Sequence, residues 1–155
     1  CLLNLLGNAA KFTHRGTIQI IAEIEKDDEG TGGLCLRVQD TGVGIVEEHR
    51  KRIFEGFFPT QETNKYSSKK PYDFNAGGKG ADLLRMKIFP ERYGFKLEMT
   101  SDRCRYIPGH ENTCPGNIEE CPYCSSGEDC HASGGSTFSL YFPPPSEQKS
   151  VILPD

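Results

Sequence analysis

The hydrophobic pattern of residues 2–13 predicts an amphipathic helix. Its apolar positions recur at mostly helical spacing: Leu2, Leu5, Leu6, Ala9, Ala10 and Phe12. Between them, Asn4, Asn8 and Lys11 recur at intervals that place them on one face of the same helix. One side of this helix is therefore expected to enter a core, while the other presents two carboxamides and an amine.

After Gly16 the pattern changes to the alternation typical of strands. Residues 17–25 (TIQIIAEIE) are β-branched and alternate, and residues 26–33 (KDDEGTGG) read as a turn. In residues 34–40, Leu34, Leu36 and Val38 are expected to point inward. The two segments together predict a β-hairpin.

The remaining elements complete an α+β architecture. Residues 47–54 predict a short helix, and residues 81–93 a second one that Pro90 is expected to end or kink. Two further strands are expected at residues 95–100 and 136–142, and the polar residues 59–80 read as a long loop. The fold class expected is α+β, a two-layer α/β sandwich with one mixed or antiparallel sheet and helices on one face. It would form one domain over residues 1–142, followed by a Pro-rich tail at residues 143–155.

The composition of the chain limits the kinds of partner that we expect. The 155 residues suit one domain, and their net charge is only −4. Residues 102–134 hold five of the seven cysteines and carry that whole net charge, so the rest of the chain is neutral. Neither a nucleic acid nor direct membrane insertion is expected, because no basic patch and no apolar run of ~18–20 residues occurs. The chain lacks an initiator Met, so we expect a fragment of a longer protein.

Three polar motifs carry candidate chemistry. The face with Asn4, Asn8 and Lys11 could hold a hydrated Mg²⁺ and a phosphate, or it is a solvated helix face. In VQDTGVGI, Asp40 could accept a hydrogen bond from an exocyclic amine beside a glycine-rich backbone, or the segment is a turn with an Asx-type bond. Residues 77–80 (GGKG) could bind an anion before a helix, or they belong to a flexible loop.

The order of four segments is more specific than any one of them. LLNLLGNAAKFT, VQDTGVGI, IFEGFFPT and GGKGADLLRMKIFPERYGFKLEMTS closely resemble the N box, first glycine box, phenylalanine box and second glycine box of sensor histidine kinases. The resemblance to their ATP-binding catalytic domain covers residues 2–101 and resumes at residues 134–142 (GGSTFSLYF). It implies the Bergerat fold, in which ATP lies between the N-box helix and a mobile lid.

The resemblance also implies roles for the helix residues. Asn8 would bind Mg²⁺, supported by Asn4 one turn earlier. Lys11 would meet phosphate oxygens, and Phe12 would lie beside the adenine. Asn4, Asn8 and Lys11 are thus the residues that we expect to act in catalysis.

Further positions are implied in the two glycine boxes. Asp40 would take the adenine amine, and Gly42 and Gly44 would make room for the ring. The lid would cover residues 58–80, with these candidate phosphate partners: Lys65, Lys69, Lys70, Gly78, Lys79 and Gly80.

The family implies partners outside this chain. The γ-phosphate would pass to a histidine on the protein's own dimerisation domain, in a parent homodimer, with a response regulator downstream. The domain would be cytoplasmic, and the resemblance leaves open whether the parent protein is anchored in a membrane.

Two other functions stay open. Gyrase-type and chaperone-type ATPases resemble one another in a Glu, placed where this chain has Asn4, that orients water; a carboxamide cannot accept that proton. In the second glycine box, Asp82 stands where the family usually has a glycine. A degenerate module with weakened ATP binding, used for interaction, is therefore the alternative function.

Residues 102–133 are an insertion relative to the family. Cys114, Cys121, Cys124 and Cys130 could bind a structural Zn²⁺, with Cys104, His110 and His131 in reserve. A disulfide framework or idle thiols are the alternatives, and glutaredoxin-type chemistry at CPYC is disfavoured because no helix is expected in the residues that follow it.

Overall fold

The computed structural model describes residues 1–26, 32–55, 81–109, 112, 114–115 and 118–144. Their order along the chain is helix, hairpin, two helices, strand, insertion and strand. The bounds are α1 (Leu2–Phe12), β1 (Ile18–Lys26), β2 (Gly32–Asp40), α2 (Glu47–Arg52), α3 (Ala81–Tyr93), β3 (Lys96–Asp102), a 3-10 turn η2 (Ile118–Glu120), α4 (Gly127–His131) and β4 (Gly135–Phe142).

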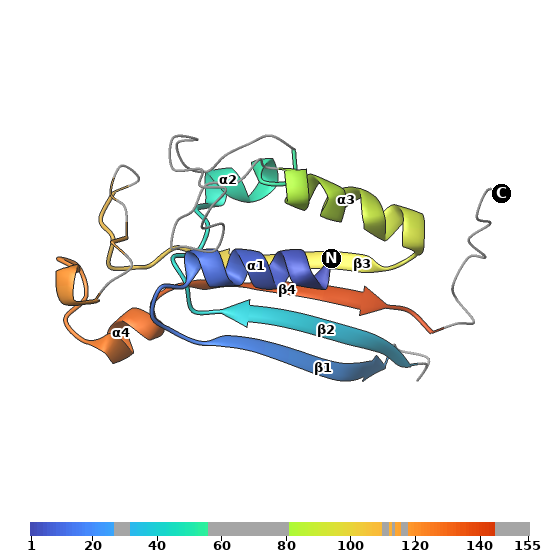
Figure 1. Cartoon of the computed structure of the whole chain (residues 1–155), viewed down its shortest axis with the longest axis horizontal. Coiled ribbons are helices and arrows are strands. Elements are labelled where there is room, and N and C mark those ends of the chain that lie inside the picture. The colour runs from blue at the N-terminus through green and yellow to red at the C-terminus, as the bar shows by residue number, and fades with distance from the viewer. Residues whose placement is uncertain (27–31, 56–80, 110–111, 113, 116–117, 145–155) are drawn as a thin grey trace.

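The four strands form one sheet in the order β1-β2-β4-β3 (Figure 1). All three pairings are antiparallel, so of the two sheet types expected, mixed or antiparallel, the described strands form the antiparallel one. The cause lies in the connections: β1 and β2 form a hairpin, and β4 runs back between β2 and β3.

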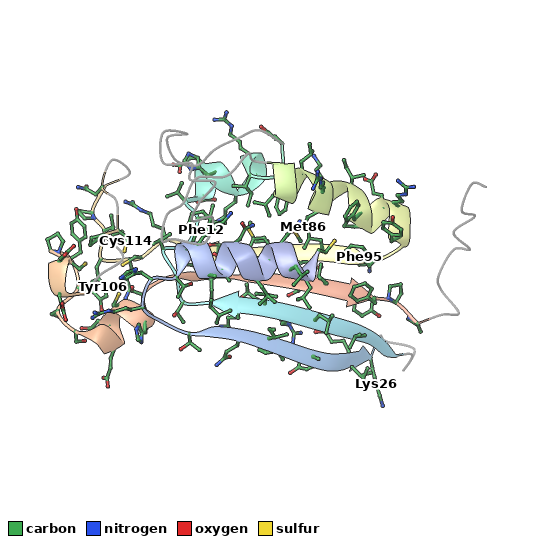
Figure 2. All side chains as sticks on the ribbon, viewed as in Figure 1. Phe12, Lys26, Met86, Phe95, Tyr106 and Cys114 are labelled. Carbon is green, nitrogen blue, oxygen red and sulfur yellow. The ribbon has the colours of Figure 1, made fainter. Side chains whose placement is uncertain are left out.

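The helices cover one face of this sheet, which confirms the two-layer α+β sandwich. In Figure 1, α1 and α3 lie on the same side, and α1 packs on β2 while α3 packs on β3. The core between the layers is built around four fully buried side chains: Leu5, Val38, Met86 and Leu140. Figure 2 shows Met86 and Phe95 between α3 and the sheet.

Two local expectations need correction, whereas the helix expected at residues 81–93 is confirmed: α3 runs through Pro90 and ends at Tyr93. The helix expected at residues 47–54 stops at Arg52. In β2, Val38 is buried as expected, but Leu34 is 39% exposed because it lies near the open edge that β1 forms.

The other face of the sheet is polar. Arg37 forms ion pairs with Glu23 and Glu25 of β1, and Lys96 lies over the ring of Tyr141. Cys35 is buried on this face, where burial and the charges of neighbouring glutamates raise the pKa of its thiol. Among the described residues, no helix covers this face.

Candidate functional site

The candidate site lies at the end of the sheet where β2 ends and β4 begins. The segment that follows β2, residues 41–45 (TGVGI), is called the glycine loop here. The N–H of Gly42 donates to the Asp40 carboxylate at 2.9 Å, which is the Asx-type bond that a turn reading of this motif predicts. Two hydrogen bonds between Thr17 and Thr41 hold the other side of the loop against the start of β1.

The glycine loop is joined directly to the C-terminal end of α1. The N–H of Val43 donates to the carbonyl oxygen of Phe12 at 3.0 Å. A Cβ added at Gly42 would lie only 2.3 Å from that carbonyl oxygen, so only glycine allows this approach. The two segments of the resemblance that lie far apart in the sequence are therefore in contact.

Asp40 is the electrostatic centre of the site. Its side chain is buried, and burial raises its pKa, while hydrogen bonds from the backbone N–H groups of Gly42 and Ser136 lower it in part. A carboxylate can accept about four hydrogen bonds, so these two donors leave acceptor capacity for a ligand. A buried acceptor of this kind fits an exocyclic amine.

The remaining candidate residues lie along α1, whose C-terminal end meets the glycine loop. Leu5 and Ala9 are buried in the core, and Asn4, Asn8 and Lys11 are half-buried. Asn8 lies one turn before Phe12, which Figure 2 shows at the end of α1. An amide oxygen and an ammonium group form a donor set that suits a hydrated Mg²⁺ and a phosphate.

The glycine-rich start of the second glycine box, residues 77–80, lies outside the described residues. This applies to the lid and to its candidates: Lys65, Lys69, Lys70, Gly78, Lys79 and Gly80. The helix expected after them is confirmed as α3, which begins at Ala81. The role of Asp82 stays a prediction, since its side chain is not described.

The start of the insertion is in contact with the candidate site. Arg50 of α2 donates to the carbonyl oxygen of Ile45 and to the carboxylate of Asp102, both at 3.3 Å. Gly44 has a φ of 67° and lies against the backbone of Asp102, where a Cβ would be 1.8 Å from the carbonyl oxygen. Farther out, Arg15 forms an exposed ion pair with Glu119 at 3.5 Å.

A cavity of about 240 Å³ lies between the glycine loop and the insertion. On one side it is lined by Phe12, Gly42 and Val43, and on the other by cysteine and histidine side chains of the insertion. Cys114 lines this cavity, and Figure 2 shows it in the insertion beyond the end of α1.

The thiols of the insertion gather differently from the expected set. The neighbouring thiols of Cys104 and Cys121 add to burial in raising the pKa of Cys124, and the thiol of Cys124 in turn acts on the pKa of Cys130. Cys104 is buried, and its sulfur lies 3.0 Å from the hydroxyl of Ser133. Cys104, and not Cys114, thus joins the group, because the base of the insertion folds back onto its last turn.

The expected zinc site at Cys114, Cys121, Cys124 and Cys130 is not supported. No group of three or more His, Cys, Asp or Glu side chains in the described part of the chain is arranged to hold a metal ion. None of the seven cysteines, all of which are described, forms a disulfide, so the structure contains no disulfide framework. A helix does follow CPYC, contrary to expectation: α4 begins after Ser126, whose side chain accepts a hydrogen bond from the N–H of Asp129.

Among the described helices, none is long and apolar enough to cross a bilayer. This finding agrees with the absence of long apolar runs in the sequence.

Sequence comparison identifies the class of protein that this fold and site define. Residues 1–146 match the family described as histidine kinase-, DNA gyrase B-, and HSP90-like ATPase. The chain belongs to this family, and its curated relatives show that it is an ATP-binding catalytic domain of the histidine kinase type.

Two relatives illustrate the similarity. The sensor histidine kinase AruS of Pseudomonas aeruginosa is 38% identical over 100 residues, which are 64% of this chain and 9% of that protein. Hybrid signal transduction histidine kinase C of Dictyostelium discoideum is 35% identical over 101 residues, or 65% of this chain and 8% of that protein. The chain thus spans about a tenth of the length of these curated relatives.

Solved structures share the fold. The crystal structure of full-length ShkA in complex with AMPPNP aligns with a TM-score of 0.53 at 22% identity, covering 92% of this chain and 20% of that one. The mycobacterial sensor histidine kinase MprB gives a TM-score of 0.51 at 20% identity, covering 92% of this chain and 68% of that one.

Sequence reasoning missed the residues that join the site to β3 and β4. Ser101 and Ser136 are both buried, and their hydroxyl groups lie 2.9 Å apart. The alternation of β3 and β4 places both serines on the core side of the sheet. Nothing else in the sequence indicates that their hydroxyl groups are in contact.

Proposed function

We propose that this chain binds Mg–ATP and donates the γ-phosphate to a histidine on a separate dimerisation domain. The observation that carries the proposal is the buried carboxylate of Asp40, held by the N–H groups of Gly42 and Ser136. Asp40 can still accept a hydrogen bond from the amine of an adenine. The helix that ends beside the glycine loop bears Asn8 and Lys11, which suit the phosphates at the other end of the same nucleotide.

Each residue has a distinct task in this proposal. Asp40 recognises the exocyclic amine of adenine, a charge-assisted hydrogen bond that contributes about 1.5–3 kcal/mol. Phe12 covers the ring edge, and Lys11 offers a positive charge to phosphate oxygens. Asn8, with Asn4 behind it, would hold Mg²⁺, which neutralises phosphate charge when bound. The chain itself thus binds and orients the nucleotide, which is most of what phosphoryl transfer requires of a protein.

Asn4 favours transfer to a protein over transfer to water. It lies one turn before Asn8 on α1 and is half-buried. A carboxamide cannot act as general base for an attacking water, so hydrolysis should be slow and the γ-phosphate would be kept for the acceptor. This argues against a stand-alone ATPase of the gyrase or chaperone type.

The partners follow from this reaction. A phosphoaccepting histidine on a dimerisation domain, in a homodimeric parent protein, and a response regulator that receives the phosphate would both lie outside this chain. The two curated relatives named above are histidine kinases by name, which supports this assignment.

The test is calorimetric titration of the chain with Mg²⁺ and a non-hydrolysable ATP analogue. Wild type should bind, and Asp40→Ala should bind at least about tenfold more weakly, because the adenine amine loses a charged acceptor. Ser139→Ala, on the polar face of the sheet, is the matched control and should bind like wild type. Equal and negligible heats for wild type and Asp40→Ala would instead favour the degenerate interaction module.

A further inference from the structure

The hydroxyl of Ser101 lies where three segments of the site meet. It accepts a hydrogen bond from the N–H of Ile45 at 2.8 Å and donates one to the carbonyl oxygen of Gly135 at 2.9 Å. The Ser136 hydroxyl lies 2.9 Å away, and it must be the donor, since the single Ser101 proton is already used. Ser101 is 4% exposed, and its full hydrogen-bonding capacity is used inside the protein.

This contact continues to Asp40. Ser101 faces Ser136 across β3 and β4, and Asp40 faces Ser136 across β2 and β4. The backbone N–H of Ser136 lies close enough to the Asp40 carboxylate to lower its pKa. Gly135 has a φ of 141°, and a Cβ there would lie 2.1 Å from the carbonyl oxygen of Asp40, so the start of β4 is pressed against the end of β2. The hydroxyl of Ser101 therefore fixes the backbone that supplies one of the two donors to Asp40.

The same hydroxyl fixes the far end of the glycine loop. Ile45 is the last residue of that loop, and its N–H has Ser101 as acceptor although the two residues are 56 positions apart. The first donor to Asp40, Gly42, belongs to the same loop. Both hydrogen bonds that position the carboxylate thus depend on backbone that Ser101 holds.

We infer that Ser101 is a positioning residue of the nucleotide site, which orients Asp40 through the glycine loop and the first residues of β4. This inference deepens the proposed function and rests on it for the identity of the ligand. Removing the hydroxyl leaves the N–H of Ile45 and the carbonyl of Gly135 buried without their partner, and both segments can then shift.

The binding experiment compares three variants with wild type. Ser101→Ala should bind the ATP analogue about tenfold more weakly, and Ser101→Thr, which keeps a hydroxyl, should recover most of that loss. Ser136→Ala should have a smaller effect, because its backbone N–H to Asp40 remains. Ser139→Ala on the opposite face is the matched control, with no change expected.

A second measurement needs no nucleotide. The pKa of Asp40, measured by carboxyl ¹³C NMR, should rise further in Ser101→Ala, because the hydrogen bonds that lower it are weakened. The amide of Ile45 should also exchange faster with solvent. If wild type does not bind the analogue but both changes occur, the proposed ligand is wrong and the positioning role stands.

The inference is overturned if Ser101→Ala leaves the Asp40 pKa and Ile45 exchange as they are in Ser139→Ala. A loss of stability alone, with the Asp40 pKa unchanged, would also overturn it, since it would show that Ser101 acts only in packing.

Discussion

The carbonyl oxygen of Phe12 accepts a hydrogen bond from the N–H of Val43 at 3.0 Å, which joins the last residue of α1 to the glycine loop. One end of the candidate site therefore moves with the helix that carries Asn4, Asn8 and Lys11. A change that separates these two segments should affect stability and nucleotide binding together.

Gly42→Ala tests this junction. The added methyl group would lie 2.3 Å from the Phe12 carbonyl oxygen and 2.8 Å from the Asp40 carboxylate, so the loop must move away from α1. We expect the free energy of unfolding to fall by about 1–3 kcal/mol, as for other overpacked sites. Denaturant unfolding measures this loss, and nucleotide titration should show weaker binding.

Gly127→Ala is the matched control for that substitution. A Cβ at Gly127 meets no atom within 4 Å, and the residue begins α4. The free energy of unfolding of the Gly127→Ala variant should equal that of wild type or exceed it by up to about 1 kcal/mol, because alanine favours the helical conformation more than glycine does. Equal stability of Gly42→Ala and Gly127→Ala would show that the close approach does not constrain the loop.

Leu5→Ala tests the packing of α1 on the sheet. Leu5 is 1% exposed and lies in the core cluster, whereas Leu3 on the same helix is 82% exposed. Leu5→Ala should lower the free energy of unfolding by about 2–5 kcal/mol through the lost transfer energy and the cavity. Leu3→Ala should change it by less than about 0.5 kcal/mol. Similar losses for both variants would mean that α1 is packed differently.

The sequence was sufficient for the elements that local pattern defines. The spacing of Leu5 and Ala9 predicted α1, and the alternation around Val38 predicted β2, because each depends on one periodicity that burial enforces. The motif DTGVG also offered a turn with an Asx-type bond, which the N–H of Gly42 forms with Asp40, while the role of Asp40 as an acceptor for a ligand amine stays a prediction.

What the sequence did not predict depends on contacts between distant residues. The bond between Ser101 and Ile45 spans 56 positions, and nothing local to either residue marks it. Cysteine spacing likewise suggested Cys114 as a member of the thiol group, whereas Cys104 joins Cys124 because of how the insertion folds back.

Asp40 should make both stability and binding depend on pH. Burial raises its pKa, so between the ordinary and the raised value the folded protein keeps a proton that the unfolded chain has lost. The free energy of unfolding should therefore fall as pH rises through this window and level off above it. Urea unfolding at a series of pH values measures the slope, which Asp40→Asn should remove.

Nucleotide affinity should change in the opposite sense. As pH falls below the raised pKa, Asp40 becomes protonated and loses its charge as an acceptor, so affinity should decrease. Asp40→Asn should bind about tenfold more weakly than wild type above the window and show no such step. A step of equal size in the variant would assign the titration to another group.

Cys124 should react slowly with alkylating reagents. Burial, and next the neighbouring thiols of Cys104 and Cys121, raise the pKa of Cys124 to about 12. At pH 8 the thiolate fraction is then roughly a thousandfold smaller than for an ordinary cysteine, and only the thiolate attacks iodoacetamide. Pulse alkylation followed by peptide mass spectrometry should find Cys124 protected in the folded protein and modified in denaturant.

The alkylation rate of Cys124 should rise about tenfold per pH unit above pH 8 while the chain stays folded. Cys104→Ser removes one of the two thiols that raise the pKa of Cys124, so it should lower that pKa and speed the reaction. Modification of Cys124 at the same rate in folded and denatured protein would contradict the buried thiol group, and so would protection that disappears on adding a metal chelator.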